Sequence, residues 1–215
     1  NRRHFKPQSL NNMNKKISNL IVTSWMFLVT VPFLLGEIKI IPLDQQTSMK
    51  WGKLSEGNGI RKVESTEAEY NSHNRHGPIT YYHVPFSKGT FSLSWKHNLT
   101  KKVVLVFETE VNGKPSHLFK VFIHGTPAKN STKSDVISFV TYKSIPGSKK
   151  KKVNVTTEKY HAEVGEWHET SVTLSDDLAT IRIDDRTFTV KDESLRNKVI
   201  KCGINHKWGT LETKD

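Results

Sequence analysis

Hydrophobic and polar residues alternate along short stretches of the chain from Ile60 onward. This two-residue period is typical of β-strands with one buried face, and no window of ten residues in this region has the spacing of an amphipathic helix. Turn sequences such as Asn112-Gly113 and Pro146-Gly147 separate the stretches. The pattern predicts strands at 79–84, 90–96, 103–110, 118–125, 135–142, 152–157, 167–174, 178–184, 187–190 and 199–206. Short strands in this number predict an all-β fold, a two-sheet antiparallel β-sandwich or jelly roll.

Alternation also predicts which side chains share a face of a sheet. Between Leu118 and His124, every second residue is apolar and is expected to face the core. The opposite face is mixed, with Leu118, Lys120, Phe122 and His124. The mixed outer face of a two-sheet sandwich is a place where a ligand can lie. We therefore expect a ligand surface around Lys120 and His124.

The N-terminal part has a different pattern, because residues 17–35 form an uncharged, mostly apolar run that follows two lysines. This is the layout of a secretory signal, and its length also approaches that of a membrane-spanning anchor. We interpret residues 1–12 as a mis-called start or a remnant, 13–36 as a signal peptide or uncleaved signal anchor, 37–50 as a linker, and 51–215 as the β-sandwich domain. The sequence thus predicts export to the periplasm or the cell exterior, with residues 17–35 anchoring the chain in the inner membrane if they are not cleaved.

The net charge falls once the leader is set aside. The formal charge of the chain is +12, and residues 1–36 hold five of the 33 basic residues and no acidic one, which leaves 28 basic and 21 acidic residues. Residues 149–152 are all lysine and have no aromatic residues among them. Such a run is typical of a solvated loop, so we expect no nucleic-acid binding. The lone cysteine, Cys202, excludes an intramolecular disulfide and is expected to be a small buried side chain.

Two motifs in the C-terminal third carry a family resemblance. Gly165-Glu166-Trp167-His168 followed by residues 173–188 resembles a hairpin of the concanavalin A-like lectin and glucanase jelly rolls. The ending, residues 203–215, resembles exported bacterial domains of the 3-keto-disaccharide hydrolase group, which is typical of polysaccharide-degrading bacteria. The resemblance implies a concanavalin A-like jelly roll, and it implies that the chain stops one strand short of its usual length.

The resemblance does not extend to a catalytic signature. Enzymatic members of the related group tend to carry an acidic strand followed by an Asn-Ser-Gly turn and Arg, and the comparable stretch, 91–98, has neither. Laminarinase-type jelly rolls carry Glu-x-Asp-x-x-Glu, which places the carboxylates on one face of a strand. Glu64, Glu67 and Glu69 come closest here, with the wrong spacing. The catalytic residues, if any, are therefore unknown.

Sugars are usually held by an aromatic ring together with a few polar groups. Trp95 is expected in the core, since it alternates with apolar residues, and Glu108 is expected at the solvated end of a strand. The ring candidates otherwise are Tyr81, Tyr82, Tyr142 and Trp208. The residues that we predict to bind the ligand are Tyr82, Glu108, Lys120, His124 and His206.

The histidines have none of the spacings of a zinc site, so we expect no metal and no cofactor. The expected partner is a glycan or polysaccharide. Three functions remain open at this point: an exported carbohydrate-recognition domain, a carbohydrate-active hydrolase of the 3-keto-disaccharide type, and a structural envelope domain without a small ligand. The sequence leaves the glycan and the oligomeric state undetermined.

Overall fold

The computed structural model describes residues 47–98, 102–124, 135–144 and 151–214. The predicted signal segment, the residues before it, most of the predicted linker and residues 149 and 150 of the lysine run lie outside these ranges. Within the described ranges, no helix is long and apolar enough to cross a membrane.

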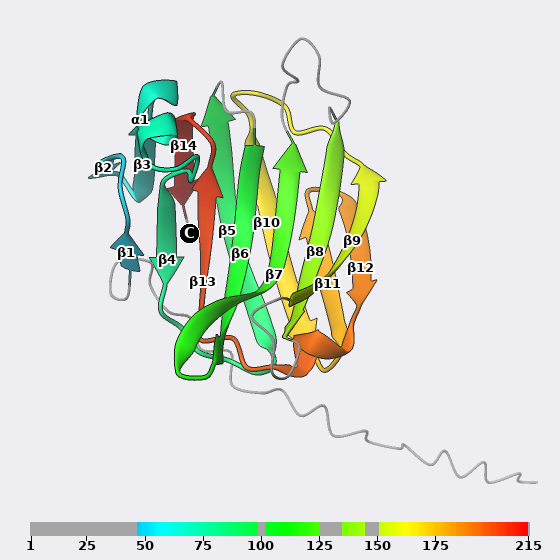
Figure 1. The fold of residues 1–215 in the computed structure, drawn as a ribbon. Helices are drawn as coiled ribbons and strands as arrows, with labels where there is room; N and C mark the ends of the chain where they lie inside the picture. Colours follow the sequence, from blue (N-terminus) through cyan, green and yellow to red (C-terminus); the bar gives the residue numbers. More distant parts are fainter. Residues whose placement is uncertain (1–46, 99–101, 125–134, 145–150, 215) are drawn as a thin grey trace, which may run out of the picture. The chain divides into compact units, whose positions relative to one another are not determined.

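The described part of the chain forms two antiparallel sheets of seven strands each (Figure 1). We call the one that faces the viewer the front sheet; its spatial order is β1 (Thr47–Met49), β4 (Ile79–Tyr82), β13 (Lys201–His206), β6 (Lys102–Val111), β7 (Lys114–His124), β8 (Val136–Ser144) and β9 (Lys151–Lys159). The back sheet has the order β12 (Arg186–Lys191), β11 (Leu178–Ile183), β10 (Trp167–Ser175), β5 (Gly89–Asn98), β14 (Gly209–Lys214), β3 (Ile60–Ser65) and β2 (Lys53–Gly57). The predicted all-β sandwich is thus confirmed, and each predicted strand overlaps an observed one.

Four further strands and two short helices escape the alternation pattern. β1 lies within the range predicted to be a linker and pairs with β4. β2 and β3 form a polar hairpin whose strands lack a run of alternating apolar residues. β14 is implied only by the family resemblance of residues 203–215. A 3₁₀ helix, Glu193–Arg196, precedes β13.

The helix α1 (Glu67–Ser72) is stabilised at its start by contacts between residues close together in the sequence. Thr66 accepts a hydrogen bond from the backbone N–H of Glu69, and the Glu69 carboxylate accepts one from the backbone N–H of Thr66. This reciprocal pair is a capping box, which satisfies two backbone groups that a helix start would otherwise leave unpaired. The motif is visible in the sequence, so this helix was predictable without any periodic apolar stripe.

The core lies between the two sheets. Trp95 is fully buried there, as predicted, and its Nε1–H donates a hydrogen bond to Thr170 Oγ1 at 2.8 Å. Cys202 is also buried, as predicted, and burial raises the pKa of its thiol to about 12. A thiol with so high a pKa is inert at neutral pH.

A β-bulge changes the predicted faces of β7. Phe107 of β6 pairs with Phe119, but the next residue, Glu108, pairs with His117, so Leu118 has no partner in the ladder. The predicted place of Leu118 on the mixed face is therefore wrong: it is buried in the core. The extra residue instead turns His117 to the side of Glu108, which strict alternation does not predict.

A candidate ligand site on the outer face of the front sheet

The register of the front sheet aligns the side chains of the site in rows across four strands. In one row, Ile79 of β4 faces Asn205 of β13, which pairs with Val104 of β6 and then with Phe122 of β7. Residues directly opposite one another in a sheet point to the same side, so each row presents one set of side chains. The next row consists of Tyr81, Gly203, Val106 and Lys120.

The outer face is apolar over these rows. Ile79, Tyr81, Val104 and Val106 form a second cluster of buried side chains, separate from the core, and Phe122 packs against it. An outer sheet face normally consists of solvated polar residues. An apolar outer face that belongs to a hollow is instead typical of a binding surface.

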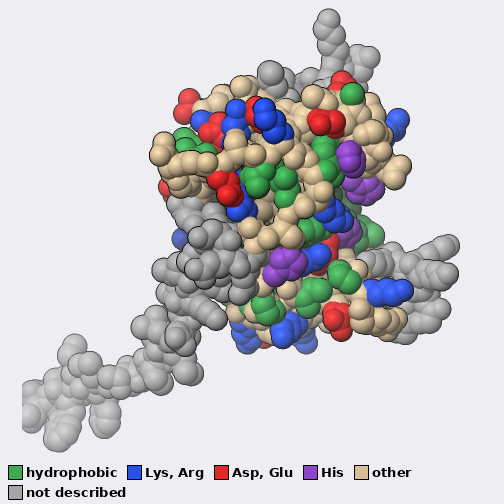
Figure 2. Space-filling model, turned by 90° about the vertical axis from the view of Figure 1, so that its left-hand side faces the viewer, with side chains coloured by type: hydrophobic (Ala, Val, Ile, Leu, Met, Phe, Trp, Pro, Cys, Tyr) green, Lys and Arg blue, Asp and Glu red, His purple; other side chains and the backbone are tan. Residues whose placement is uncertain are grey.

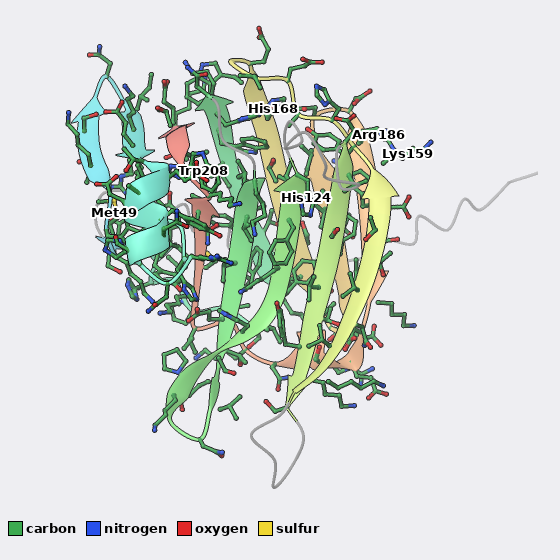
Figure 3. All side chains as sticks on the ribbon, turned by 45° about the horizontal axis from the view of Figure 1, so that its top comes forward. Met49, His124, Lys159, His168, Arg186 and Trp208 are labelled. Carbon is green, nitrogen blue, oxygen red and sulfur yellow. The ribbon has the colours of Figure 1, made fainter. Side chains whose placement is uncertain are left out.

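A cavity of about 310 Å³ lies over this apolar floor. Its walls come from outside the strands: Lys50 and Trp51 follow β1, while Tyr70, Arg75 and His76 come from α1 and the turn after it. Trp208, which Figure 3 shows near α1, continues this wall, because its ring lies 5.2 Å from that of Tyr70. The volume is in the range of small-molecule sites, which start at about 300 Å³.

A glycine brings the α1 wall over the sheet. A Cβ at Gly77 would overlap the carbonyl oxygen of His206, so only glycine lets the chain after α1 pass this close to the end of β13. Figure 2, whose right-hand edge is the front of Figure 1, shows His, Lys, Arg and hydrophobic side chains gathered on this side of the molecule.

Glu108 is the centre of a buried polar cluster at one end of the cavity. Its carboxylate accepts a hydrogen bond from the Tyr81 hydroxyl at 2.8 Å and forms an ion pair with Lys201 Nζ at 3.2 Å. His117 Nδ1 lies 3.4 Å from the same carboxylate. Glu108 is 5% exposed, so the prediction of a solvated strand end is wrong. Burial alone would raise the pKa of this carboxyl, but the contacts with His117, Tyr81 and Lys201 outweigh it and hold the pKa at about 2.

The hydrogen bond between Tyr81 and Glu108 depends on Gly203. Tyr81 lies on β4 and Glu108 on β6, and the strand between them, β13, has Gly203 opposite Tyr81. A Cβ at position 203 would lie 2.5 Å from the carbonyl oxygen of Thr80 and 3.0 Å from the Tyr81 ring. The absence of a side chain therefore lets the tyrosine cross the strand, and Lys201 Nζ then lies 3.9 Å from the centre of its ring.

Lysines lie against the aromatic rings around the cavity. Lys50 Nζ is 5.8 Å from the ring centre of Tyr81, Lys102 Nζ 5.1 Å from that of Phe122, and Lys207 Nζ 4.2 Å from that of Trp208. Such cation–π contacts orient an ammonium group at an aromatic surface. The result is a hollow with ring faces and positive charges side by side.

Three of the predicted ligand residues, Glu108, Lys120 and His206, are among the residues that line this cavity. Lys120 Nζ lies 5.6 Å from the ring centre of Tyr142. A fourth, His124, lies on the same face at the end of β7 (Figure 3), where its ring is 6.3 Å from that of Phe122. It pairs with Lys102, a lining residue, but is not itself among the described lining residues.

Tyr82 and the side chain of His206 point to the interior. Tyr82 is 4% exposed and packs in the core, with its ring 5.5 Å from that of Phe91, so its place on the ligand face is wrong. The cause is strand alternation, which gives the outer position to Tyr81. His206 is likewise an interior side chain: its Nε2 lies 3.3 Å from Ser65 Oγ, and burial lowers its pKa to about 4.

The residues that sequence reasoning missed are those joined only by tertiary contacts. Lys201, His117 and Trp51 carry no local motif. Lys201 and His117 reach Glu108 through the pairing of β13 and β7 with β6, and His117 does so through the bulge. Alternation with the apolar, core-facing Ile204 could have identified Asn205, rather than His206, as the residue of β13 that faces outward.

A second hollow, of about 490 Å³, lies near Tyr142 and the 3₁₀ helix. Both of its basic side chains already have partners, because Lys143 pairs with Glu193 at 3.0 Å and Arg196 with Asp177 at 3.0 Å. The cavity over β4, β13, β6 and β7 is the better candidate, since it combines an apolar floor, aromatic walls and a buried polar cluster.

No family model matches the chain, and no curated protein matches it. Similar solved structures include the carbohydrate-binding module CBM66 from Bacillus subtilis, which is 14% identical and covers 79% of this chain and 92% of its own, with a TM-score of 0.53. Lactose- and MES-liganded congerin II is 8% identical over 61% of this chain and 96% of its own, with a TM-score of 0.47. The family 7 alginate lyase A1-II' is 13% identical over 74% of this chain and 76% of its own, also with a TM-score of 0.47.

The likeness to the carbohydrate-binding module, with its TM-score of 0.53, supports the jelly-roll β-sandwich fold and nothing finer. None of the three names refers to the 3-keto-disaccharide hydrolase group, so that part of the resemblance stays a prediction.

Proposed function

We propose that this protein binds a glycan in the cavity on the outer face of the front sheet. The observation that carries the proposal is the combination of ring faces and polar groups over an apolar floor. The C–H face of a sugar packs on an aromatic ring, while its hydroxyls take hydrogen bonds from nearby polar side chains. Phe122 and Trp208 would supply the rings, and Asn205 and Lys120 the polar contacts. The jelly-roll likeness to a carbohydrate-binding module agrees with this role without assigning it.

The same geometry favours binding over hydrolysis. A glycosidase of the common kind needs two carboxyl groups, one of which must be protonated in order to act as an acid. Glu108 is the one carboxylate among the described lining residues, and its pKa of about 2 keeps it ionised at neutral pH. The Tyr81 hydroxyl donates a hydrogen bond to this carboxylate, and burial together with Glu108 raises the pKa of Tyr81 above its usual value, so it stays protonated. The Glu108 cluster is therefore suited to fix the geometry of the cavity rather than to transfer protons.

A glycan array on the full chain tests the proposal, with Trp208→Ala as the diagnostic variant. The back sheet offers a matched control in Trp167, which lies on its outer face and has Lys214 Nζ 4.4 Å from its ring centre. Trp208 has Lys207 in the same arrangement at 4.2 Å. We expect Trp208→Ala to weaken glycan binding at least tenfold and Trp167→Ala to leave it unchanged.

Loss of binding in both variants, or in neither, would contradict the assignment of the site. A chain that binds no glycan on the array would overturn the function itself and leave the structural envelope domain as the better hypothesis. A 3-keto-glycoside cleavage assay on the same preparation tests the hydrolase alternative, and we expect no turnover.

We also propose that the protein works outside the cytoplasm. The support is the two lysines followed by the uncharged residues 17–35. Expressed from Met13 in a Gram-negative host, the chain should be found in the periplasm or held at the inner membrane facing it. Recovery of the soluble full-length chain from the cytosol would refute export.

A further inference from the structure

The charges around the cavity point to the class of glycan. The described lining contains five cationic side chains and one carboxylate. The cations are Lys50, Arg75, Lys102, Lys120 and Lys207. The carboxylate, Glu108, is already neutralised within the sheet by Lys201. Among the described lining residues, cationic side chains therefore outnumber carboxylates by five to one.

The positions of these cations follow from the fold. Lys102 and Lys120 extend from two neighbouring strands of the floor, and Lys50 and Lys207 stand on the walls. Each of Lys50, Lys102 and Lys207 lies over the ring of a lining residue: Tyr81, Phe122 and Tyr70, respectively. They therefore surround one volume, where the low-dielectric ring faces strengthen their combined field.

The outer face of the back sheet provides an internal comparison. There, Lys96 and Lys214 also lie over a ring, that of Trp167, at 5.0 and 4.4 Å. Lys96, however, forms an ion pair with Glu212 on the adjacent strand at 2.8 Å. The lysine–aromatic contact occurs on both sheets, but five cations to one carboxylate in the described lining of a cavity is a feature of the front sheet.

From this arrangement we infer that the glycan is anionic, a polymer that carries carboxylate or sulfate groups; the inference rests on the proposed function. A neutral sugar in the cavity would displace water from several ammonium groups without offering a charge in return, and that desolvation opposes binding. An anionic sugar pairs with those groups, and the pairing also selects against neutral glycans. The rings then contact the sugar face, while the lysines around them contact its acidic substituents.

The test uses pairs of polymers that differ in charge alone. Polygalacturonate is compared with carboxyl-reduced polygalacturonate, and dextran sulfate with dextran, by isothermal titration calorimetry on the full chain. We expect at least tenfold tighter binding to the charged member of one pair, and which pair responds identifies carboxylate or sulfate as the recognised group. The affinity should fall as the salt concentration rises, because salt screens the attraction between the cationic side chains of the cavity and the anionic polymer.

A variant pair separates the site from the general basicity of the chain. The double variant Lys120→Gln/Lys207→Gln removes two charges from the cavity. We expect it to lose at least tenfold in affinity for the charged polymer. Lys191→Gln, an exposed lysine at the end of β12 in the back sheet, should leave the affinity unchanged. An unchanged unfolding curve for each variant confirms that the fold is intact.

The outcomes distinguish the two proposals. Equal affinity for the charged and neutral members of each pair would overturn the anionic preference and leave glycan binding in place. Binding to no polymer at all would overturn the proposed function. Equal losses in the cavity and Lys191 variants, or equally strong competition by single-stranded DNA, would show unspecific charge attraction and would also overturn the inference.

Discussion

We expect the variant Glu108→Gln to lower the stability of the protein, because it removes the charge at the centre of the Glu108 cluster. The variant keeps the shape of the side chain and an oxygen that can accept from the Tyr81 hydroxyl, but it removes the charge opposite Lys201. In the folded protein the pKa of Glu108 is about 2, against an ordinary value of 4.5. One pKa unit corresponds to 1.36 kcal/mol, so the ionised carboxylate contributes about 3 kcal/mol to the free energy of unfolding at neutral pH.

The pH dependence has a definite sign. Because the folded-state pKa lies below the unfolded one, the contribution is fully present above about pH 4.5 and is lost as the pH falls towards 2. Asp192 and Asp184 also have lowered pKa values, which their hydrogen bonds maintain against the opposing effect of burial. The wild-type curve therefore declines for several reasons, and the difference between wild type and Glu108→Gln isolates Glu108.

Urea unfolding at a series of pH values between 7 and 2 measures this difference. We expect Glu108→Gln to be about 3 kcal/mol less stable at pH 7, and the gap to close at the acidic end of the range. Lys201→Met is a useful companion, since breaking the same buried pair from the other side should cost about 3 kcal/mol or more. A variant as stable as wild type at pH 7, or a gap that does not change with pH, would refute the ionised, buried pair.

Three further predictions concern the frame of the site and the core. Gly203→Ala should lower the free energy of unfolding by about 2 kcal/mol, because its Cβ would lie 2.5 Å from the Thr80 carbonyl oxygen; normal stability in urea would count against it. His206→Gln should flatten the loss of stability between pH 6.5 and 4, since the unfolded state then no longer takes up a proton that the folded histidine, with its pKa of about 4, resists; unfolding curves parallel to wild type would contradict this. Thr170→Val should cost about 2 kcal/mol by leaving the buried Trp95 Nε1–H without its acceptor, and calorimetry that finds no change would disprove that role.

Alternation is a local property of a strand, so the sequence was sufficient for the fold class and for most strand positions. It also placed Trp95 and Cys202 in the core and put Lys120 and His124 on the outer face of their strand. The capping box at Thr66 is equally local, and a reading that looked for it would have found α1. These features depend on residues within a few positions of one another, which is the range over which sequence patterns carry information.

The site itself was decided by pairing between distant segments. Glu108 looks like a solvated strand end until β13 supplies Lys201 and β4 supplies Tyr81, and both contacts depend on the register of the front sheet. A single bulge moved Leu118 into the core and brought His117 to the Glu108 side, and no alternation rule anticipates one extra residue. The sequence determined which residues form strands, because that follows from neighbouring side chains. Which charges face one another across the sheet was decided by tertiary structure, because register and bulges arise only when the strands pair.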